Sequence, residues 1–131
     1  MADFEKEVEE INSILQKGDE MSFAAAEIRA ERLKAEVQRS ECLEREARIA
    51  TVEVILGTAQ AFLGKFDSAL KNLESALKKH VSFEALSLGY WNMAYKMLIK
   101  CRNRANMLPE ARGMMMSFGE FRDVVRSEFG E

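Results

Sequence analysis

Two apolar helical patterns that meet at one glycine constrain the fold of this chain more than any other feature of its sequence. The patterns occupy residues 56–77, which read LGTAQAFLGKFDSALKNLESAL, and they meet at Gly64. After that glycine, small and apolar residues recur at spacings of four and three: Ala69, Leu73 and Ala76. This is the spacing of a single helix face. We therefore expect a helical hairpin that turns at Gly64, with Ala69 in contact with Gly57 or its neighbours.

The same residues resemble a tetratricopeptide repeat. That repeat has a leucine–glycine pair, a turn glycine, and then alanine, a large apolar residue and alanine at helical spacing. Six positions agree with the pattern: Leu56, Gly57, Gly64, Ala69, Leu73 and Ala76, with leucine at the fifth in place of the usual phenylalanine. Gln60 replaces the usual aromatic residue and Val81 replaces the usual proline. The resemblance covers one repeat, about residues 50–79, and implies a short right-handed α-solenoid that binds another protein.

Apolar spacing and helix-breaking residues predict six helices in three antiparallel pairs. The expected helices lie near residues 3–18, 22–39, 41–63, 67–79, 83–105 and 109–129. Turns at Gly18, Gly64 and Asn106 are 46 and 42 residues apart, which exceeds the ~34 residues of the standard repeat. We place a break near Ser40, which can cap the helix that follows it. One unbroken helix over residues 22–62 is the alternative.

The composition favours an all-α fold in a single domain over residues 1–131. The chain is 47 % hydrophobic and has one proline, and good helix formers dominate it. No segment alternates convincingly between apolar and polar residues, as a strand would. The net charge of -3 disfavours non-specific binding to nucleic acid. Since no run of 18 apolar residues occurs, neither a transmembrane helix nor a membrane partner is expected.

The residues that could carry chemistry are few and scattered. Cys42 and Cys101 belong to no C-x-x-C pair and the chain has one histidine, so we expect no metal, no cofactor and no disulfide framework. Buried free thiols and an acidic N-terminal segment favour a cytoplasmic location. His80 has no nucleophile near it in the sequence, and the usual phosphate-binding, hydrolase and metalloprotease motifs are missing. The protein is therefore predicted not to be an enzyme and to have no catalytic residues.

The resemblance places a binding groove on the first helix of each pair. Carried over to this chain, the apolar floor of that groove consists of Val54, Thr58 and Phe62. The helix that holds these residues is apolar on almost every side in its second half. A helix of this kind is usually buried between neighbours. A core role for Val54 and Phe62 is therefore the alternative interpretation.

The charged side of the same groove is predicted on the fifth helix. Lys96, Lys100 and Arg104 follow one another at steps of four and so share one helix face. Three cations in this arrangement would attract an acidic peptide or a chain terminus. Lys96 and Lys100 match two basic positions of family members that bind chaperone tails, but Ile55 stands where those members need an asparagine. We therefore do not expect a chaperone tail as the ligand; a solvated helix face is the alternative.

The predicted function is that of an adaptor, a scaffold or a small chaperone that binds a protein segment in a helical groove. Small acidic tetratricopeptide chaperones of bacterial secretion systems are one form that the resemblance suggests. The alternative is a structural subunit that associates with copies of itself, for example as a homodimer. That alternative rests on the last predicted helix, which is unusually apolar for an isolated end of an array: Phe118, Phe121, Val125 and Phe129.

Overall fold

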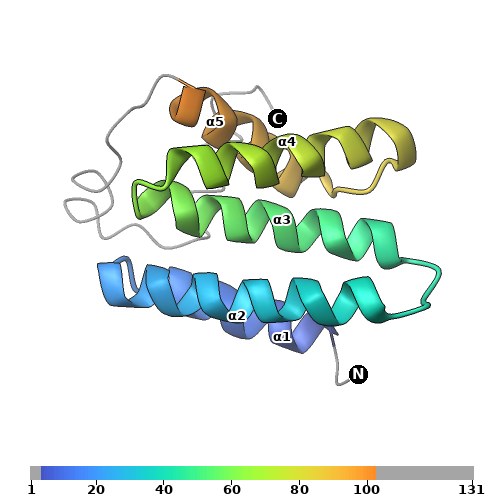
Figure 1. Ribbon diagram of the computed structural model, residues 1–131, viewed down its shortest axis with the longest axis horizontal. Coiled ribbons are helices and arrows are strands. Elements are labelled where there is room, and N and C mark those ends of the chain that lie inside the picture. The colour runs from blue at the N-terminus through green and yellow to red at the C-terminus, as the bar shows by residue number, and fades with distance from the viewer. Residues whose placement is uncertain (1–3, 103–131) are drawn as a thin grey trace.

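A computed structural model describes residues 4–102 of the chain as five helices (Figure 1). These are α1 (Phe4–Leu15), α2 (Glu20–Arg39), α3 (Arg45–Phe62), α4 (Phe66–Phe83) and α5 (Leu88–Arg102). No strand occurs in this part of the chain, which confirms the all-α prediction. The predicted turn at Asn106 and the predicted helix over residues 109–129 lie outside the described residues.

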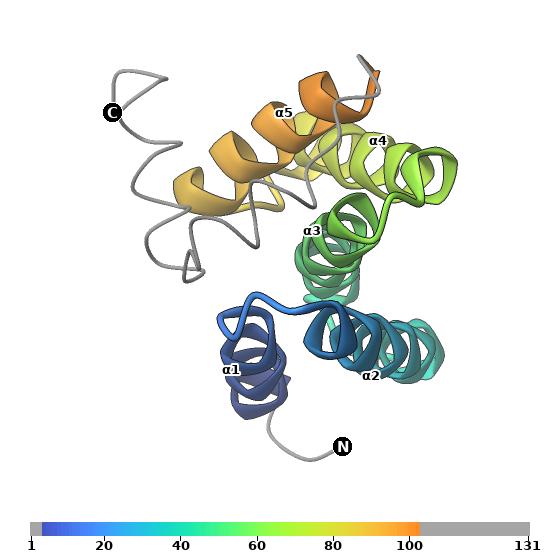
Figure 2. The ribbon, with the colours of Figure 1, turned by 90° about the vertical axis from the view of Figure 1, so that its left-hand side faces the viewer.

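α3 is the central helix of the arrangement. It packs against α2 and against α4, while α1 packs on α2 and α5 packs on α4. Both α1 and α5 also contact α3. Viewed end-on, α1 and α5 lie on one side of α3, and α2 and α4 lie on the other (Figure 2). This position explains why the second half of α3 is apolar around most of its circumference, since every face of it meets a neighbouring helix.

The α1–α2 and α3–α4 hairpins both turn at a glycine with positive φ. Gly18 has φ of 74° and Gly64 has φ of 80°, a region that favours glycine. The amide of Gly64 donates to the carbonyl of Ala61 at 3.0 Å, and the next amide, Lys65 N–H, donates to the carbonyl of Gln60 at 2.9 Å. These bonds satisfy carbonyls at the end of α3. The predicted turns at Gly18 and Gly64 are confirmed.

A polar residue starts α2 and another ends it. The carboxylate of Asp19 accepts a hydrogen bond of 2.7 Å from the amide of Ser22, so Asp19 is the N-cap. At the other end, Ser40 is extended (φ -81°, ψ 148°) and its hydroxyl accepts from the amide of Cys42 at 3.2 Å. This local bonding competes with helix continuation. The predicted break is confirmed, and one continuous helix over residues 22–62 is wrong. The predicted role of Ser40 as the cap of the following helix is also wrong, because Ser40 is the C-cap of α2 and α3 begins only at Arg45, after Glu44.

Three predicted helix boundaries are wrong by four or five residues, and the first is the start of α3, which lies at Arg45 rather than near residue 41. α4 continues to Phe83 rather than ending near Lys79, and α5 begins at Leu88 rather than near residue 83. α4 ends where Glu84 adopts a left-handed conformation with φ of 51°. That conformation is usually taken by glycine or asparagine, so the sequence carries no recognisable stop signal there.

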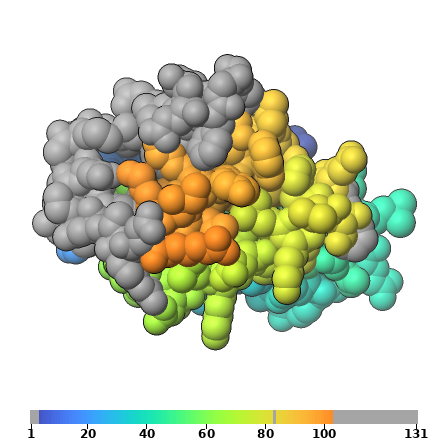
Figure 3. All heavy atoms as spheres, turned by 90° about the horizontal axis from the view of Figure 1, so that it is seen from above, coloured from blue at the N-terminus to red at the C-terminus, as the bar shows by residue number. Residues whose placement is uncertain are grey.

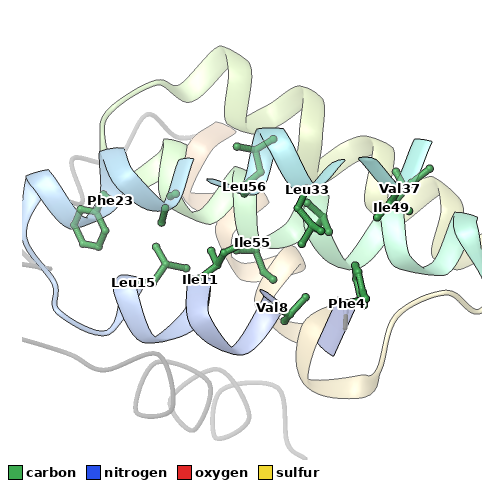
Figure 4. Packing of buried hydrophobic residues seen from close by; sticks show 14 residues of the cluster. Phe4, Val8, Ile11, Leu15, Phe23, Leu33, Val37, Ile49, Ile55 and Leu56 are labelled. Carbon is green, nitrogen blue, oxygen red and sulfur yellow. The ribbon is translucent and has the colours of Figure 1, made fainter. Parts of the chain in front are cut away.

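Two apolar clusters share α3. The first lies among α1, α2 and α3 and includes Phe4, Ile11, Phe23, Leu33 and Ile55 (Figure 4). The second lies among α3, α4 and α5 and is built from small and flexible residues: Val54, Ala69, Leu73, Ala76, Met93 and Met97. The partly buried rings of Phe62 and Tyr90 pack against both clusters. The two clusters are therefore connected, and a substitution in α3 affects the packing of the other four helices.

α3 and α4 approach most closely at Gly57. A Cβ atom on Gly57 would lie 2.8 Å from Cγ of Leu73 and 3.3 Å from the carbonyl oxygen of Ala69. No side chain fits there without a shift of its neighbours. The predicted close approach of Ala69 and Gly57 is confirmed.

Candidate binding groove on α2

The three residues predicted to form an apolar groove floor are placed in or beside the core. Val54 and Thr58 are buried, and the Thr58 hydroxyl donates to the carbonyl of Val54 at 2.7 Å. Phe62 is half-buried, and its ring stacks on Phe23 with 4.9 Å between ring centroids. Val54 and Thr58 therefore do not line an open groove, and the alternative interpretation of Val54 as a core residue is correct. The physical reason is that α4 and α5 cover this side of α3.

The predicted charged face of α5 is also not an open row of cations. Lys96 is only 8 % exposed, so it forms neither the open charged side of a groove nor part of a solvated helix face, and both interpretations of this position are wrong. Lys100 is half-buried, both lysines have interactions, and Arg104 lies outside the described residues. α5 contacts α4 and α3 together, so its buried arc is wide and includes polar positions. Spacing along one helix does not reveal how many neighbours cover it.

A polar cluster that the sequence analysis missed lies at the junction of α2, α3 and α4. Its centre is Glu53 on α3, which is 2 % exposed. The Glu53 carboxylate pairs with Lys34 Nζ at 3.0 Å and Lys79 Nζ at 3.2 Å, and accepts from the Ser75 hydroxyl at 2.8 Å. A buried carboxylate needs such partners because desolvation of its charge is costly.

The cluster continues along the same junction through side-chain amides. Gln60 donates to the buried Glu27 carboxylate at 3.2 Å and accepts from Asn72 at 2.8 Å. Glu27 also pairs with Lys65 at 2.8 Å. Lys34 donates to Asn72 at 3.1 Å and thereby joins this half to Glu53.

The polar cluster lies along a shallow groove of about 500 Å³ between α2 and α4. Its groups bond mainly to one another, so the cluster holds three helices in register rather than offering free groups to a ligand. A carboxylate in the middle of an apolar helix, such as Glu53 between Val52 and Val54, is the one signal of it in the sequence.

A second, larger groove of about 660 Å³ lies on the side of α2 next to α1. Its lining is mostly from α2, with one residue from α1: Glu7, Arg29, Arg32, Leu33, Glu36, Arg39 and Ser40. Arg29 closes one side by ion pairs to Glu10 at 2.7 Å and Glu7 at 3.1 Å. The hydrogen bond to Glu10, and then that to Glu7, raises the pKa of Arg29 despite partial desolvation. The guanidinium group of Arg29 is therefore paired with carboxylates of α1.

Arg32 and Arg39 differ from Arg29. Both are exposed, and neither forms an ion pair or hydrogen bond with any other residue between 4 and 102. They lie on one side of α2 because residues seven apart are separated by almost two whole turns. Leu33, which is buried, lies at the base of the groove. The groove thus offers two free guanidinium groups beside an apolar base, a combination that the sequence analysis did not single out.

The described part of the chain contains neither a candidate metal site nor a helix that could span a membrane. There, His, Cys, Asp and Glu residues form no group of three or more that could hold a metal ion. No helix between residues 4 and 102 is long and apolar enough to cross a bilayer. Neither Cys42 nor Cys101 takes part in a disulfide bond, and Cys101 is buried.

Comparisons with known proteins do not assign a family to this geometry. No family model, no curated protein and no solved structure matches the chain. The function must therefore be inferred from the residues of the α2 groove and their surroundings.

Proposed function

We propose that this protein is a non-enzymatic interaction module, an adaptor or a small chaperone, that binds a polypeptide segment in the groove on α2. One observation carries the proposal: Arg32 and Arg39 line an open groove of about 660 Å³ and have no partner among the described residues. Guanidinium groups bind carboxylates through paired hydrogen bonds. Two of them in one groove favour an acidic segment.

A polypeptide explains this groove better than a nucleic acid does. Three carboxylates lie in or next to it, those of Glu7, Glu10 and Glu36. A continuous phosphate backbone would be repelled by these groups and by the net charge of -3. A peptide can instead place its carboxylates only where the free arginines are.

We also propose that the helices form a short right-handed solenoid similar to tetratricopeptide arrays. Two observations support this. The α1–α2 and α3–α4 hairpins both turn at a glycine with positive φ, and Gly57 meets Ala69 and Leu73 where the repeat pattern requires small residues. α5 would then be the first helix of a third pair. The proposed site differs from the usual groove of that family, since it lies on a second helix.

Self-association is the second candidate, and a specific observation favours it. Leu88, Tyr95 and Ile99 are exposed large residues at spacings of seven and four on α5, so they share one helix face. Atoms of α5 lie at the surface beside those of α4 (Figure 3). An exposed apolar face of this kind often marks an interface. Static light scattering tests it, because a monomer at all concentrations would exclude this candidate.

The binding proposal is tested by affinity purification followed by quantitative mass spectrometry, with two charge-reversal variants compared. In the first, Arg32→Glu and Arg39→Glu reverse the free arginines. In the second, Lys71→Glu and Lys78→Glu reverse two exposed cations of α4, also seven residues apart. A protein retained by the parent and the α4 variant, lost with the α2 variant, and bound again when both components are purified supports the proposal. Equal retention by both variants would refute it.

A further inference from the structure

The outer face of α2 carries exposed apolar residues in line with the free arginines. Met21 is 85 % exposed and Ile28 is 58 % exposed. Met21, Ile28, Arg32 and Arg39 are separated by seven, four and seven residues. At 3.6 residues per turn these four positions fall within about 40° of arc. They form one straight stripe, which we call the α2 stripe, with an apolar first half and a cationic second half.

The α2 stripe lies on the far side of the helix from the core. The buried residues Phe23, Ala30 and Val37 are also seven apart and mark the opposite face, which meets α1 and α3. Met21 and Ile28 therefore do not serve the packing of the described helices. The stripe is about 27 Å long at a rise of 1.5 Å per residue, and its spacing of seven, four and seven residues matches the contact positions of two helices packed side by side.

Resting on the proposed function, we propose that the occupant is an amphipathic helix of a partner protein with an acidic first half and an apolar second half. Its carboxylates pair with Arg32 and Arg39, and its apolar residues contact Ile28 and Met21. The helix runs antiparallel to α2. In that direction its N-terminus, where carboxylates are favoured by the helix dipole, lies beside Arg39 at the C-terminal end of α2.

Charge complementarity favours a partner over a second copy of this chain. α2 and α5 are the two described helices with more than one exposed large apolar residue. Both end in basic residues, Arg39 on α2 and Lys100 and Arg102 on α5. In an antiparallel pair of α2 stripes, each arginine would face Met21 or Ile28 of the other copy, because the exposed glutamates of α2 lie beside the stripe and not on it. α5 contains no carboxylate at all. A helix that satisfies the stripe must bring acidic groups at positions where these two faces have none.

The probe is a fluorescent, alanine-rich helical peptide in which two glutamates and then two leucines repeat the spacing of the α2 stripe. A matched peptide has lysines in place of the glutamates, and a third has the order of the two halves reversed. Fluorescence anisotropy with the full chain should show binding of the first peptide that weakens with salt. The lysine peptide should not bind, and the reversed peptide should bind several-fold more weakly.

Double variants of this protein test which residues of the α2 stripe contact the peptide. Arg32→Glu with Arg39→Glu should raise the Kd of the acidic peptide by about ten-fold, the product of two partly exposed ion pairs. Met21→Ser with Ile28→Ser should raise it by a similar factor. Lys71→Glu with Lys78→Glu should leave it unchanged. If circular dichroism shows that a charge reversal disturbs folding, Arg32→Gln with Arg39→Gln replaces it.

Three kinds of result would overturn the inference. The first is a peptide result without the expected charge preference, which means either no binding of the acidic peptide or equal binding of the lysine peptide. The second is tighter binding of a single-stranded oligonucleotide of similar length. The third is a dimer of the parent chain in light scattering that Arg32→Glu with Arg39→Glu converts to a monomer. The two proposals can fail separately. If the acidic peptide does not bind but the purification experiment still yields a partner that depends on Arg32 and Arg39, the amphipathic helix is refuted as the occupant and the proposed function stands.

Discussion

Gly57 on α3 faces Leu73 on α4 so closely that a Cβ on the glycine would lie 2.8 Å from Leu73 Cγ. The first prediction is that Gly57→Ala destabilises the protein. Alanine gains about 1 kcal/mol in helix propensity, but overpacking costs roughly 1–3 kcal/mol. The second effect wins because the contact is with a branch point and with a backbone carbonyl, which cannot move independently. Urea unfolding should show a lower midpoint; an unchanged or higher midpoint would contradict the contact.

The second prediction concerns α4, which forms the other side of this contact. Ala69 is fully buried, and its carbonyl oxygen lies 3.3 Å from the same Cβ position on Gly57. Ala69→Leu should overpack the hairpin and cost roughly 1–3 kcal/mol. Thermal unfolding followed by circular dichroism measures this. A melting temperature equal to that of the parent would show that α3 and α4 do not pack as described, and would remove the main support for the repeat proposal.

The third prediction concerns the buried carboxylate of the polar cluster. Glu53→Ala should destabilise the protein by about 2–3 kcal/mol, because it leaves Lys34 and Lys79 without their shared partner. The cost stays below that of a fully buried pair, since the two lysine side chains are 24 % and 21 % exposed and can recover some hydration. A double-mutant cycle with Lys34→Met isolates the pair. A coupling energy near zero would mean that the ion pair does not hold α2 against α3.

The fourth prediction concerns acid stability at the start of α2. Hydrogen bonds from the Ser22 amide and hydroxyl to Asp19 lower the pKa of that carboxyl below 3.8. A depressed carboxyl pKa stabilises the folded state above the unfolded value, and this contribution is lost as the pH falls through the folded value. Asp19→Asn keeps a capping oxygen without the charge. Between about pH 5 and pH 2, the melting temperature of the parent should therefore fall more steeply than that of Asp19→Asn, and parallel curves would refute the assignment.

The fifth prediction concerns the end of α4. Glu84 adopts φ of 51°, in the left-handed region, which costs a residue with a Cβ roughly 1–2 kcal/mol. Glu84→Gly removes that cost and loses about 0.5–1 kcal/mol through the entropy of the unfolded chain. The net gain should be about 0.5 kcal/mol. Glu84→Ala is the control, because it keeps the strain and should show no such gain; equal gains in both variants would point to another cause.

Local interactions account for the parts of the fold that were predictable from the sequence. Gly18 and Gly64 mark the hairpin turns because a positive φ favours glycine wherever it occurs. Ser40 interrupts the long polar stretch between α2 and α3 because its hydroxyl bonds to a nearby amide. The approach of α3 and α4 at Gly57 follows from small residues at helical spacing. The turns and the break act over a few residues, and the contact at Gly57 joins positions within a single hairpin, so the sequence by itself determined the class of fold and the first two hairpins.

The tertiary structure alone decided which helix faces are covered, and this determines the candidate site. Lys96 belongs to a polar pattern on α5, yet it is buried because α5 meets two helices at once. Glu27 bonds to Gln60 from 33 residues away, whereas Ile28, its immediate neighbour, points to solvent. Periodicity along one helix reports the direction of a side chain but not the number of neighbouring helices. Contacts between residues distant in sequence set that number, and so they decided that Arg32 and Arg39 on α2 are exposed whereas Lys96 on α5 is buried.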